Sequence, residues 1–222
     1  LAAVGAALVT GDVRDEPSVL RAAQGCEVAF HCARLDDPTR PRDALEAVNL
    51  VGVENTLAAC RAAGVRRLVH LSTVDVTRSN AHRSYVDEDH PQPADFVDDA
   101  AETRALAEDL VVAASDATFE TVTLRAGWIW GAGDGCIVRR VRRWARDGAP
   151  PWIDDGRALC ATTHARNLAA AMLCAARAAE APSKVFNLTD DERVSVREFL
   201  TRLAGALGVT LRASSLPWAV AW

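Results

Sequence analysis

Short apolar runs alternate with longer segments of helical periodicity along this chain. The apolar runs predict strands, and the segments in which apolar residues recur every three or four positions predict amphipathic helices. The predicted strands cover residues 7–12, 27–32, 67–72, 120–125 and 185–187. The predicted helices cover residues 16–24, 42–63, 99–115, 137–147, 165–179 and 195–207. This alternation is typical of parallel strands joined by right-handed crossovers, so it predicts an α/β fold with a doubly wound parallel sheet.

Local signals place the ends of two of these helices. Gly64 directly follows the 42–63 segment, and glycine commonly ends helices because it adopts a left-handed backbone without strain. Ser195 and Glu198 have the spacing of a capping box, in which each side chain accepts from an amide of the first turn. We therefore expect the last helix to begin at Ser195.

Length and charge limit the classes of protein that fit. A chain of 222 residues, half of them apolar, is long enough for one α/β domain and a small second lobe. Its formal net charge of −5 argues against general nucleic-acid binding, which needs a basic surface. No apolar run approaches the roughly 18 residues that span a bilayer, so we expect no membrane span.

The six cysteines show neither a Cys-x-x-Cys pair nor the spacing of metal ligands. Four of them lie inside apolar runs, where a free thiol behaves as a small hydrophobic side chain. We therefore expect no metal site, and a reducing, cytoplasmic location.

Ligands of open α/β sheets bind outside the carboxyl ends of the strands. Three predicted strands end at Asp12, at Cys32-Ala33 and at Ser72-Thr73. Taken singly, an aspartate at a strand end is more often a turn residue, and a threonine there is more often a strand former. The three strand ends nevertheless mark the edge at which a ligand is expected.

Eight stretches carry a resemblance, and they follow one another in the order in which a known family has them. They are residues 11–15 (GDVRD), 28–33 (VAFHCA), 48–56 (VNLVGVENT), 63–73 (AGVRRLVHLST), 102–108 (ETRALAE), 124–134 (LRAGWIWGAGD), 164–168 (HARNL) and 186–190 (FNLTD). Together they resemble the extended short-chain dehydrogenase/reductase family (the NAD-dependent epimerase/dehydratase type), in its 3β-hydroxysteroid dehydrogenase-like branch.

The resemblance implies a Rossmann-type fold, NAD or NADP as cofactor, and oxidation or reduction at the CH–OH/C=O pair of a steroid-like or other apolar small molecule. It divides the chain into a partial dinucleotide-binding domain, residues 1–125, and a lobe of residues 126–222. That second lobe is expected to bind mainly substrate, with Rossmann elements interleaved. The family leaves room for a homo-oligomer, and for membrane association of an intact relative.

Specific positions match the family's binding residues. Asp12 and Val13 match residues that contact the adenine ring, and Ala33 matches a small residue that lets the backbone approach the dinucleotide. Thr73 matches the hydroxyl that helps hold the substrate carbonyl, and Ala126–Ile129 matches the segment that lines the nicotinamide. These residues are the cofactor and substrate contacts that the resemblance predicts.

The family's phosphate-binding loop has no counterpart in these 222 residues. Such a loop has the pattern GxGxxG between the first strand and the first helix, whose free amides face the pyrophosphate. Gly5 is the only glycine before Gly11. In the family register residues 7–12 form the third strand, so the sheet is expected to lack its first βαβ unit. In the strand order 3-2-1-4-5-6, this loss separates the third strand from the fourth.

The family's proton donor is also replaced. The family uses a tyrosine four residues before a lysine on one helix, where both side chains share a face. This chain has one tyrosine, Tyr85, and one lysine, Lys184, so no such pair exists. The register from residues 102–108 places Ala100 at the tyrosine position and Arg104 at the lysine position. Arginine can still bind a ribose hydroxyl, but alanine cannot donate a proton.

These departures favour an oxidoreductase relative that is inactive as the 222 residues stand, in which binding of NAD or NADP is weak or lost. Two other interpretations stay open. One is a non-catalytic pseudoenzyme that acts as a binding or regulatory module. The other is a relative of the nucleotide-sugar epimerases, which share most of the eight stretches.

One pattern lies outside the resemblance. Arg139, Arg142, Arg143 and Arg146 recur at helical spacing opposite Ile137 and other apolar residues. A solvated face of an amphipathic helix is the simpler interpretation. An anion site facing the substrate crevice is the alternative.

Overall fold

The computed structural model describes residues 5–79 and 86–220. The chain forms two compact units, the first made of residues 1–125 and 170–187 and the second of residues 126–169 and 188–222. Each unit has its own core and is described by itself below. Among the described residues, no helix combines the length and the apolar character needed to cross a bilayer.

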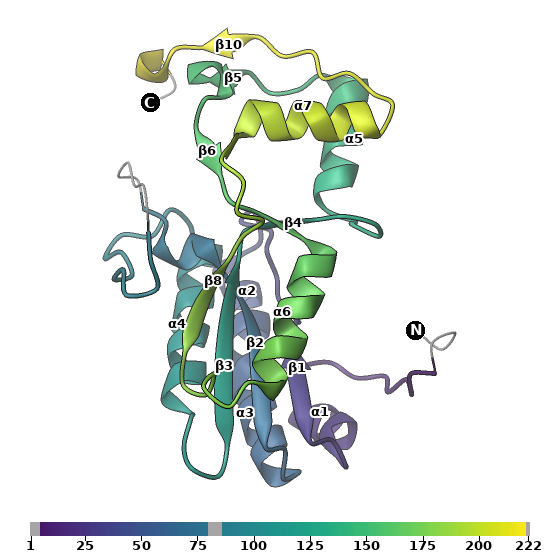
Figure 1. The fold of residues 1–222 in the computed structure, drawn as a ribbon, viewed down its shortest axis with the longest axis vertical. Helices are drawn as coiled ribbons and strands as arrows, with labels where there is room; N and C mark the ends of the chain where they lie inside the picture. Colours follow the sequence, from purple (N-terminus) through teal and green to yellow (C-terminus); the bar gives the residue numbers. More distant parts are fainter. Residues whose placement is uncertain (1–4, 80–85, 221–222) are drawn as a thin grey trace. The chain divides into compact units, whose positions relative to one another are not determined.

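Unit 1 is an α/β layer structure. Its elements are α1 (Glu16–Ala23), β1 (Val28–His31), α2 (Arg42–Glu46), η2 (Ala47–Val51), α3 (Gly52–Ala62), β2 (Arg67–Thr73), η3 (Val74–Thr77), α4 (Asp99–Ala113), β3 (Glu120–Ala126), most of α6 (Ala165–Arg177) and β8 (Val185–Leu188). The four strands form one sheet in the order β1-β2-β3-β8, and β1 pairs with β2 in parallel. Helices α3 and α4 lie behind the sheet and α6 lies in front of it (Figure 1). The doubly wound Rossmann-type arrangement is confirmed.

The prediction of a strand at residues 7–12 is wrong. Residues 5–12 belong to no strand, and each of them is exposed. Leu8 and Val9 are 65% and 53% exposed. A strand needs a neighbour to take its backbone hydrogen bonds. In this chain no described strand lies beside residues 7–12, and β1 is an edge strand that pairs with β2 alone. The segment therefore keeps an apolar strand-like sequence without the pairing that would make it a strand.

The predicted 42–63 helix is continuous but not uniform. Between α2 and α3 the backbone widens into one turn of π-helix, η2. Such turns often occur at functional sites. This one places Asn49, which is 2% exposed, inside unit 1. The apolar periodicity predicts the helix but carries no signal for the local widening.

A buried arginine fastens α6 to the sheet. Arg67, at the start of β2, is 3% exposed. Its Nη1 donates at 2.8 Å to the carbonyls of Ala175 and Ala178, at the carboxyl end of α6. Its Nε lies 2.6 Å from the Glu120 carboxylate. The last carbonyls of a helix have no partner within the helix, so this cation satisfies them and fixes the end of α6.

A buried ion pair joins α4 to β3. Glu108 accepts a bidentate contact from Arg125 through Nε at 3.0 Å and Nη2 at 2.6 Å. The other carboxylate oxygen of Glu108 accepts from the Ser72 hydroxyl of β2 at 2.5 Å. Both ionised side chains are nearly inaccessible, at 2% and 6%. Each buried charge is compensated by the other instead of by water. Together with the Ser72 contact, the pair therefore joins helix α4 to strands β2 and β3.

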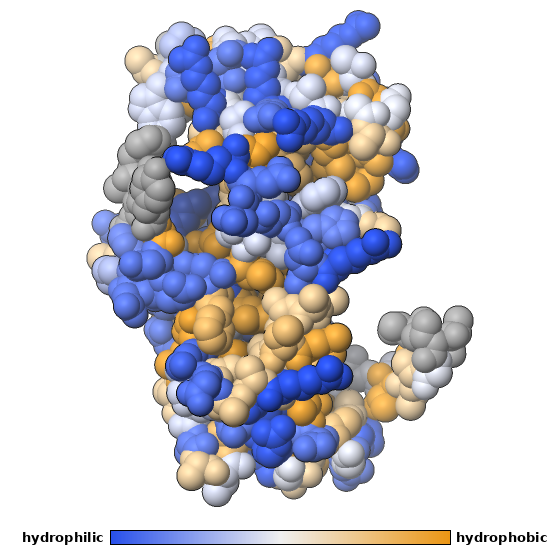
Figure 2. All heavy atoms as spheres, viewed as in Figure 1, coloured by the Kyte–Doolittle hydropathy of each residue, from blue (hydrophilic) through white to orange (hydrophobic). Residues whose placement is uncertain are grey.

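The outer face of α6 within unit 1 is apolar. Leu173 is 48% exposed, and Ala170 and Cys174 beside it on the helix are also exposed. Figure 2 shows the resulting apolar surface over this part of the helix. All six cysteines of the chain are free thiols.

Unit 2 is built from short strands around two helices. Its elements are β4 (Trp128–Trp130), α5 (Ile137–Asp147), β5 (Trp152–Ile153), η4 (Asp154–Gly156), β6 (Leu159–Cys160), β7 (Thr162–His164), β9 (Val194–Ser195), α7 (Val196–Ala206), β10 (Ser215–Leu216) and η5 (Trp218–Val220). Its core contains Ile137 and Val141 of α5 together with Phe199 and Leu200 of α7. The expected start of α7 is confirmed, because the Ser195 hydroxyl accepts from the Glu198 amide at 3.2 Å.

The basic helix in unit 2 is amphipathic, as the sequence predicts. Ile137 and Val141 are buried, while Arg139, Arg142, Arg143 and Arg146 are exposed. The anion-site interpretation of these arginines stays a prediction.

Candidate functional site

The candidate site in unit 1 begins at the carboxyl end of β2. Thr73 is the last residue of this strand and is 5% exposed. Its hydroxyl accepts from the Asp75 amide at 3.2 Å and so caps the short helix η3. The hydroxyl also lies 3.4 Å from Asp75 Oδ2. The side chain that the resemblance assigns to a substrate carbonyl therefore contacts its own loop.

Helix α4 carries the two positions that replace the family's catalytic pair. Asp98 caps the helix by accepting from the Ala101 amide at 2.7 Å. One turn contains both Ala100 and Arg104, and the Arg104 Nε donates to the Ala100 carbonyl at 2.7 Å. Ala100 is 1% exposed, so its methyl group packs inside the unit. The position presents no group that can donate a proton.

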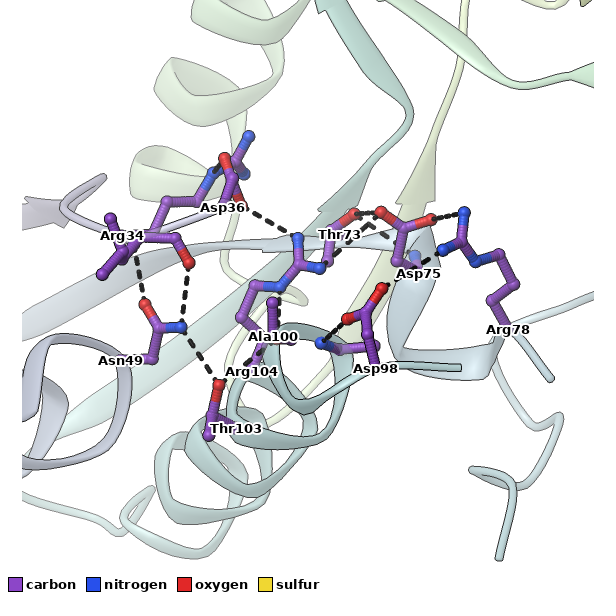
Figure 3. Close-up of polar contacts among 12 residues, drawn as sticks. Arg34, Asp36, Asn49, Thr73, Asp75, Arg78, Asp98, Ala100, Thr103 and Arg104 are labelled. Atoms are coloured by element: carbon purple, nitrogen blue, oxygen red, sulfur yellow. Dashed lines mark hydrogen bonds and ion pairs between the residues drawn. The ribbon is translucent and has the colours of Figure 1, made fainter. Parts of the chain in front are cut away.

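Arg104 is the centre of a network of alternating charges (Figure 3). Its Nη1 lies 2.9 Å from the Asp36 carboxylate, and its Nη2 lies 3.8 Å from that of Asp75. Asp36 also accepts from Arg34 at 2.6 Å. Arg78 lies 3.6 Å from Asp75 and 3.5 Å from the helix cap Asp98. Three arginines and three aspartates thus neutralise one another where β1 and β2 end.

The loop after β1 is held over this network by a buried amide. Asn49 Oδ1 accepts from the Leu35 amide at 2.8 Å, and its Nδ2 donates to the Leu35 carbonyl at 3.1 Å. The same Nδ2 lies 3.1 Å from the Thr103 hydroxyl of α4. These hydrogen bonds fix the backbone of Leu35. They thereby position the side chains of its neighbours, Arg34 and Asp36, within the network shown in Figure 3.

Asp12 and Val13 lie away from these ion pairs and contact α1 and α3. Both carboxylate oxygens of Asp12 accept from Arg14, at 2.6 Å to Nη2 and 3.0 Å to Nε. The Arg14 guanidinium lowers the pKa of Asp12 to about 2. Val13 packs against Gly52, and its carbonyl accepts from Asn55 at 2.9 Å. Ala33 is exposed and follows β1 directly.

Ala126 and Ile129 belong to unit 2, where a single carboxylate organises their surroundings. Asp190 accepts from Trp130 Nε1 and from the His164 amide, both at 2.8 Å. It also accepts from Thr162 at 3.1 Å and from Asn167 at 2.8 Å. Burial alone would raise the pKa of Asp190, but the hydrogen bonds from these donors lower it by more, so the pKa lies below its usual value. His164 packs edge-on against Trp130 at 4.6 Å between ring centroids, so it orients the strand pair β4–β7.

Comparison with known proteins identifies the family. The sequence pattern of the 3-beta hydroxysteroid dehydrogenase/isomerase family matches residues 2–218. The chain belongs to this family. The assignment to the steroid dehydrogenase-like branch of the extended short-chain dehydrogenases is thereby confirmed.

Two curated relatives of this 3-beta hydroxysteroid dehydrogenase/isomerase family member are reductases of ketones. One is the 4-hydroxy-2-methyl-3-oxo-4-farnesyl-3,4-dihydroquinoline-1-oxide ketoreductase of Stigmatella aurantiaca, 33% identical over 99% of this chain. The other is a 2-alkyl-3-oxoalkanoate reductase of Stenotrophomonas maltophilia, 34% identical over 94% of this chain. The alignments cover 65% of each relative, so the chain spans about two thirds of their length.

Solved structures show the same fold. A short-chain dehydrogenase/reductase superfamily protein from Agrobacterium tumefaciens with bound NAD superposes with a TM-score of 0.77 at 24% identity, over 98% of this chain and 76% of that one. A UDP-glucose 4-epimerase of Thermus thermophilus in complex with NAD gives 0.75 at 22% identity, over 96% of this chain and 73% of that one. At this level of identity the likeness supports the Rossmann-type fold alone.

At the position of the family's catalytic pair, the described residues keep a cation, Arg104, but no group that can donate a proton. Arg104 contacts the Ala100 carbonyl, Asp36 and Asp75 with its three nitrogen atoms, and because a guanidinium has five N–H donors, binding of a ribose hydroxyl by Arg104 stays a prediction. Ala100 offers no hydroxyl, and Tyr85 lies outside the described residues. The Asp12–Arg14 pair is more adaptable, because both side chains are about half exposed and exposed pairs open at little cost.

The structure brings together only some of the residues that the sequence predicts for the site. Thr73 and Arg104 share Asp75, and Ala100 lies one turn from Arg104. Sequence reasoning missed Asp36, Asp75 and Asn49. Asn49 lies in residues 48–56, one of the eight stretches that carry the family resemblance, so the resemblance could have marked it as a candidate site residue. Asp36 lies in the loop after β1 and Asp75 lies in the short helix η3, and apolar periodicity carries no information about which side chains these two aspartates contact.

Proposed function

We propose that this protein derives from NAD(P)-dependent oxidoreductases that act on the CH–OH/C=O pair of an apolar substrate, and that these 222 residues do not catalyse the reaction. The proposed origin from oxidoreductases is supported by the family match and by two relatives that are named as a ketoreductase and an oxoalkanoate reductase. These relatives also favour an alcohol or ketone over the nucleotide sugars of the epimerases. In this proposal unit 1 corresponds to the cofactor-binding part, and unit 2 to the part that shapes the substrate site.

The single observation that carries the loss of catalysis is the pair Ala100 and Arg104. A general acid contributes roughly 10²–10⁴-fold in rate, and the buried methyl group of Ala100 cannot provide it. Arg104 cannot take over, since a guanidinium does not release its proton at neutral pH. Its ion pairs with Asp36 and Asp75 moreover hold its charge within the protein.

The chain also lacks a GxGxxG loop within its 222 residues, so we expect no measurable binding of NAD(H) or NADP(H) by these residues alone. Isothermal titration calorimetry with both cofactors measures this. A dissociation constant in the micromolar range would show that another part of the chain binds the pyrophosphate.

One experiment tests the missing proton donor and the missing phosphate-binding loop separately. The first βαβ unit of a ketone-reducing relative is fused to residues 1–222, once with the natural Ala100 and Arg104 and once with Ala100→Tyr and Arg104→Lys. We expect both fusions to bind NAD(H), and only the second to reduce a β-ketoester or ketosteroid. A third fusion with Ala100→Phe and Arg104→Lys is the matched control, because it restores the ring and the lysine without the hydroxyl. Turnover by the fusion with natural Ala100 would overturn the proposal.

A further inference from the structure

Helix α5 of unit 2 carries an exposed face of positive charge. Its 11 residues include five arginines and one aspartate. All five arginines are exposed: Arg139, Arg140, Arg142, Arg143 and Arg146. Among the described residues, the one ion pair that they form joins Arg146 to the neighbouring Asp147. Positive charges three and four positions apart on a helix repel one another, so an anionic surface bound to this face would stabilise the helix.

The opposite face of α5 limits the kind of partner that fits. Ile137 and Val141 are buried in the core of unit 2, together with Phe199 and Leu200 of α7. The helix therefore has no apolar face left to insert between lipids, which an interfacial helix needs. General nucleic-acid binding does not suit a chain with a formal net charge of −5. An acidic protein surface is the remaining class of partner.

The chain itself contains such an acidic surface. Residues 86–99 of unit 1 hold six acidic residues and no lysine or arginine. Three of them are consecutive and exposed: Asp87, Glu88 and Asp89. Three consecutive residues span at most about 7 Å, and the arginines from position 139 to position 146 extend over about 10 Å of helix. The two surfaces therefore match in sign and in length.

Hydrogen bonds within unit 1 hold the acidic segment in place. Glu88 Oε1 accepts from the Asn187 amide of β8 at 2.7 Å, and the Glu88 carbonyl accepts from Arg125 at 3.3 Å. Asp87 and Asp89 stay exposed on either side of this anchored residue. A surface that is already ordered loses little conformational entropy on binding. The segment is therefore suited to bind a rigid, oppositely charged helix.

We propose that the arginine face of α5 in one molecule binds residues 87–89 of a second copy of this chain. Arg142 and Arg143, in the middle of the helix, contact the carboxylates of Asp87 and Asp89. The contact is made of exposed charges, so it is weak and sensitive to salt. It is independent of the proposed function, because it uses no residue of the candidate site.

Sedimentation equilibrium of the purified chain at pH 7 tests the electrostatic origin of the contact. The average mass should rise with protein concentration at about 0.01 M salt, where charges act over long distances. It should fall to that of the single chain at about 0.5 M sodium sulfate, which screens charges beyond a few ångström. Association through exposed apolar surface has the opposite dependence, because sulfate strengthens it. A single chain in both solutions, or association that grows with sulfate, overturns the proposal.

Two charge-reversed variants test the two surfaces at low salt. Arg142→Glu/Arg143→Glu and Asp87→Lys/Asp89→Lys should each abolish the association of the variant with itself. An equimolar mixture of the two should associate again, because each variant keeps one natural surface and the two reversed surfaces attract each other. If either variant alone associates like the parent chain, or if the mixture stays dissociated, the proposal is wrong.

Arg202→Glu/Arg212→Glu is the matched control for the arginine variant. Both residues are exposed in unit 2 outside α5, and the change of net charge is the same. This control should associate like the parent chain. Its dissociation would assign the effect to net charge instead of to α5, and would contradict the proposal.

Carbodiimide cross-linking identifies the contacting residues without reversing any charge. The reagent joins an amine to a carboxylate as an amide, and the chain has a single lysine, Lys184. Arg143→Lys keeps the positive charge and adds one amine on α5. Mass spectrometry of a mixture of nitrogen-15-labelled and unlabelled chains should show an amide between position 143 of one chain and Asp87, Glu88 or Asp89 of the other. A cross-link confined to single chains, or none to residues 87–89, overturns the proposal.

Discussion

Arg104 Nη1 lies 2.9 Å from Asp36 Oδ1, and this contact joins α4 to the loop that follows β1 (Figure 3). The same guanidinium lies 3.8 Å from Asp75, in the short helix after β2. At the position where the family resemblance expects a lysine beside a cofactor, the chain therefore has a cation that joins three segments of unit 1. An arginine suits this role better than a lysine, because its planar fork donates in several directions at once.

The first prediction is that Arg104 stabilises the fold. Arg104→Met keeps most of the aliphatic stem but removes the three polar contacts. Arg104 is 12% exposed and Asp36 is 41% exposed, so solvent screens the pair and the expected loss is about 1 kcal/mol in the free energy of unfolding. Urea unfolding of the purified chain measures it. Arg202→Met is the matched control, because Arg202 is 67% exposed and pairs only within its own helix. Equal losses in both variants would contradict the structural role.

How far the sequence predicts this molecule depends on the kind of interaction. The sequence predicts helix α5 with its observed bounds, Ile137–Asp147, because alternating apolar and basic residues determine a helix face locally. Residues 7–12 have an equally clear strand pattern but form no strand, since a strand depends on a neighbour that its own sequence does not encode.

The candidate site shows the same division between local and long-range information. Ala100 and Arg104 could be placed from sequence because four residues along a helix share a face. The contact of Arg104 with Asp36 could not, because 68 residues separate the two and a loop carries one of them. The π-turn that brings Asn49 to Leu35 is likewise a response to packing.

The second prediction concerns the buried pair of Glu108 and Arg125. Glu108→Ala leaves the Arg125 guanidinium, which is 6% exposed, without its carboxylate in the interior. Removal of one partner of a buried pair typically costs about 3–5 kcal/mol, which is a large part of the stability of an average domain. Urea unfolding should therefore show a much lower midpoint, or no cooperative transition.

Glu102→Ala is the matched control for that experiment. Glu102 lies on the same helix and pairs with Arg42 on the surface, so its loss is expected to be small. If the two variants lost similar stability, helix propensity rather than the buried pair would explain the effect. A Glu108→Ala variant as stable as the parent chain would contradict the prediction outright.

The third prediction is that acid destabilises unit 1 through His31 and His70. Burial lowers the pKa of His31 to about 4 and that of His70 to about 3, whereas both titrate near 6.5 in the unfolded chain. Between these values the unfolded chain binds more protons than the folded one, so stability falls as the pH falls. This stability is fully present above about pH 6.5 and is lost as the pH falls, down to about 4 for His31 and about 3 for His70. One pKa unit corresponds to about 1.4 kcal/mol, so the pair contributes several kcal/mol at most.

The window from pH 6.5 to 5 separates these histidines from the carboxylates. Asp12, Glu102 and Asp190 have lowered pKa values, so their loss of charge occurs at lower pH. Unfolding midpoints measured in this window should fall in the parent chain and stay nearly constant in the His31→Leu/His70→Leu double variant. His90→Gln, at a partly exposed loop position, is the control that should keep the slope. The same slope in the double variant would assign the effect to other groups.

The fourth prediction is that Gly52 is needed where α3 meets the segment after Asp12. A Cβ atom at Gly52 would lie 2.8 Å from Val13 Cγ2 and 3.2 Å from Val13 Cβ. Gly52→Ala should therefore displace Val13, whose carbonyl is also bound by Asn55. Alanine gains about 1 kcal/mol over glycine in a helix interior, but the clash should outweigh this gain and give a net loss of about 1–2 kcal/mol.

Two comparisons make this prediction specific to the contact with Val13. Gly205 lies in α7, where an added Cβ atom would have no neighbouring atom within 4 Å, so Gly205→Ala should stabilise the chain by up to about 1 kcal/mol. Val13→Ala removes the clashing methyl groups, so adding Gly52→Ala to a Val13→Ala background should cost little or even stabilise. Chemical unfolding of the parent chain, Gly52→Ala, Val13→Ala and the double variant gives the coupling free energy between positions 13 and 52. If Gly52→Ala were equally harmful in both backgrounds, the strain would lie in the helix itself rather than in the contact that positions residues 12 and 13.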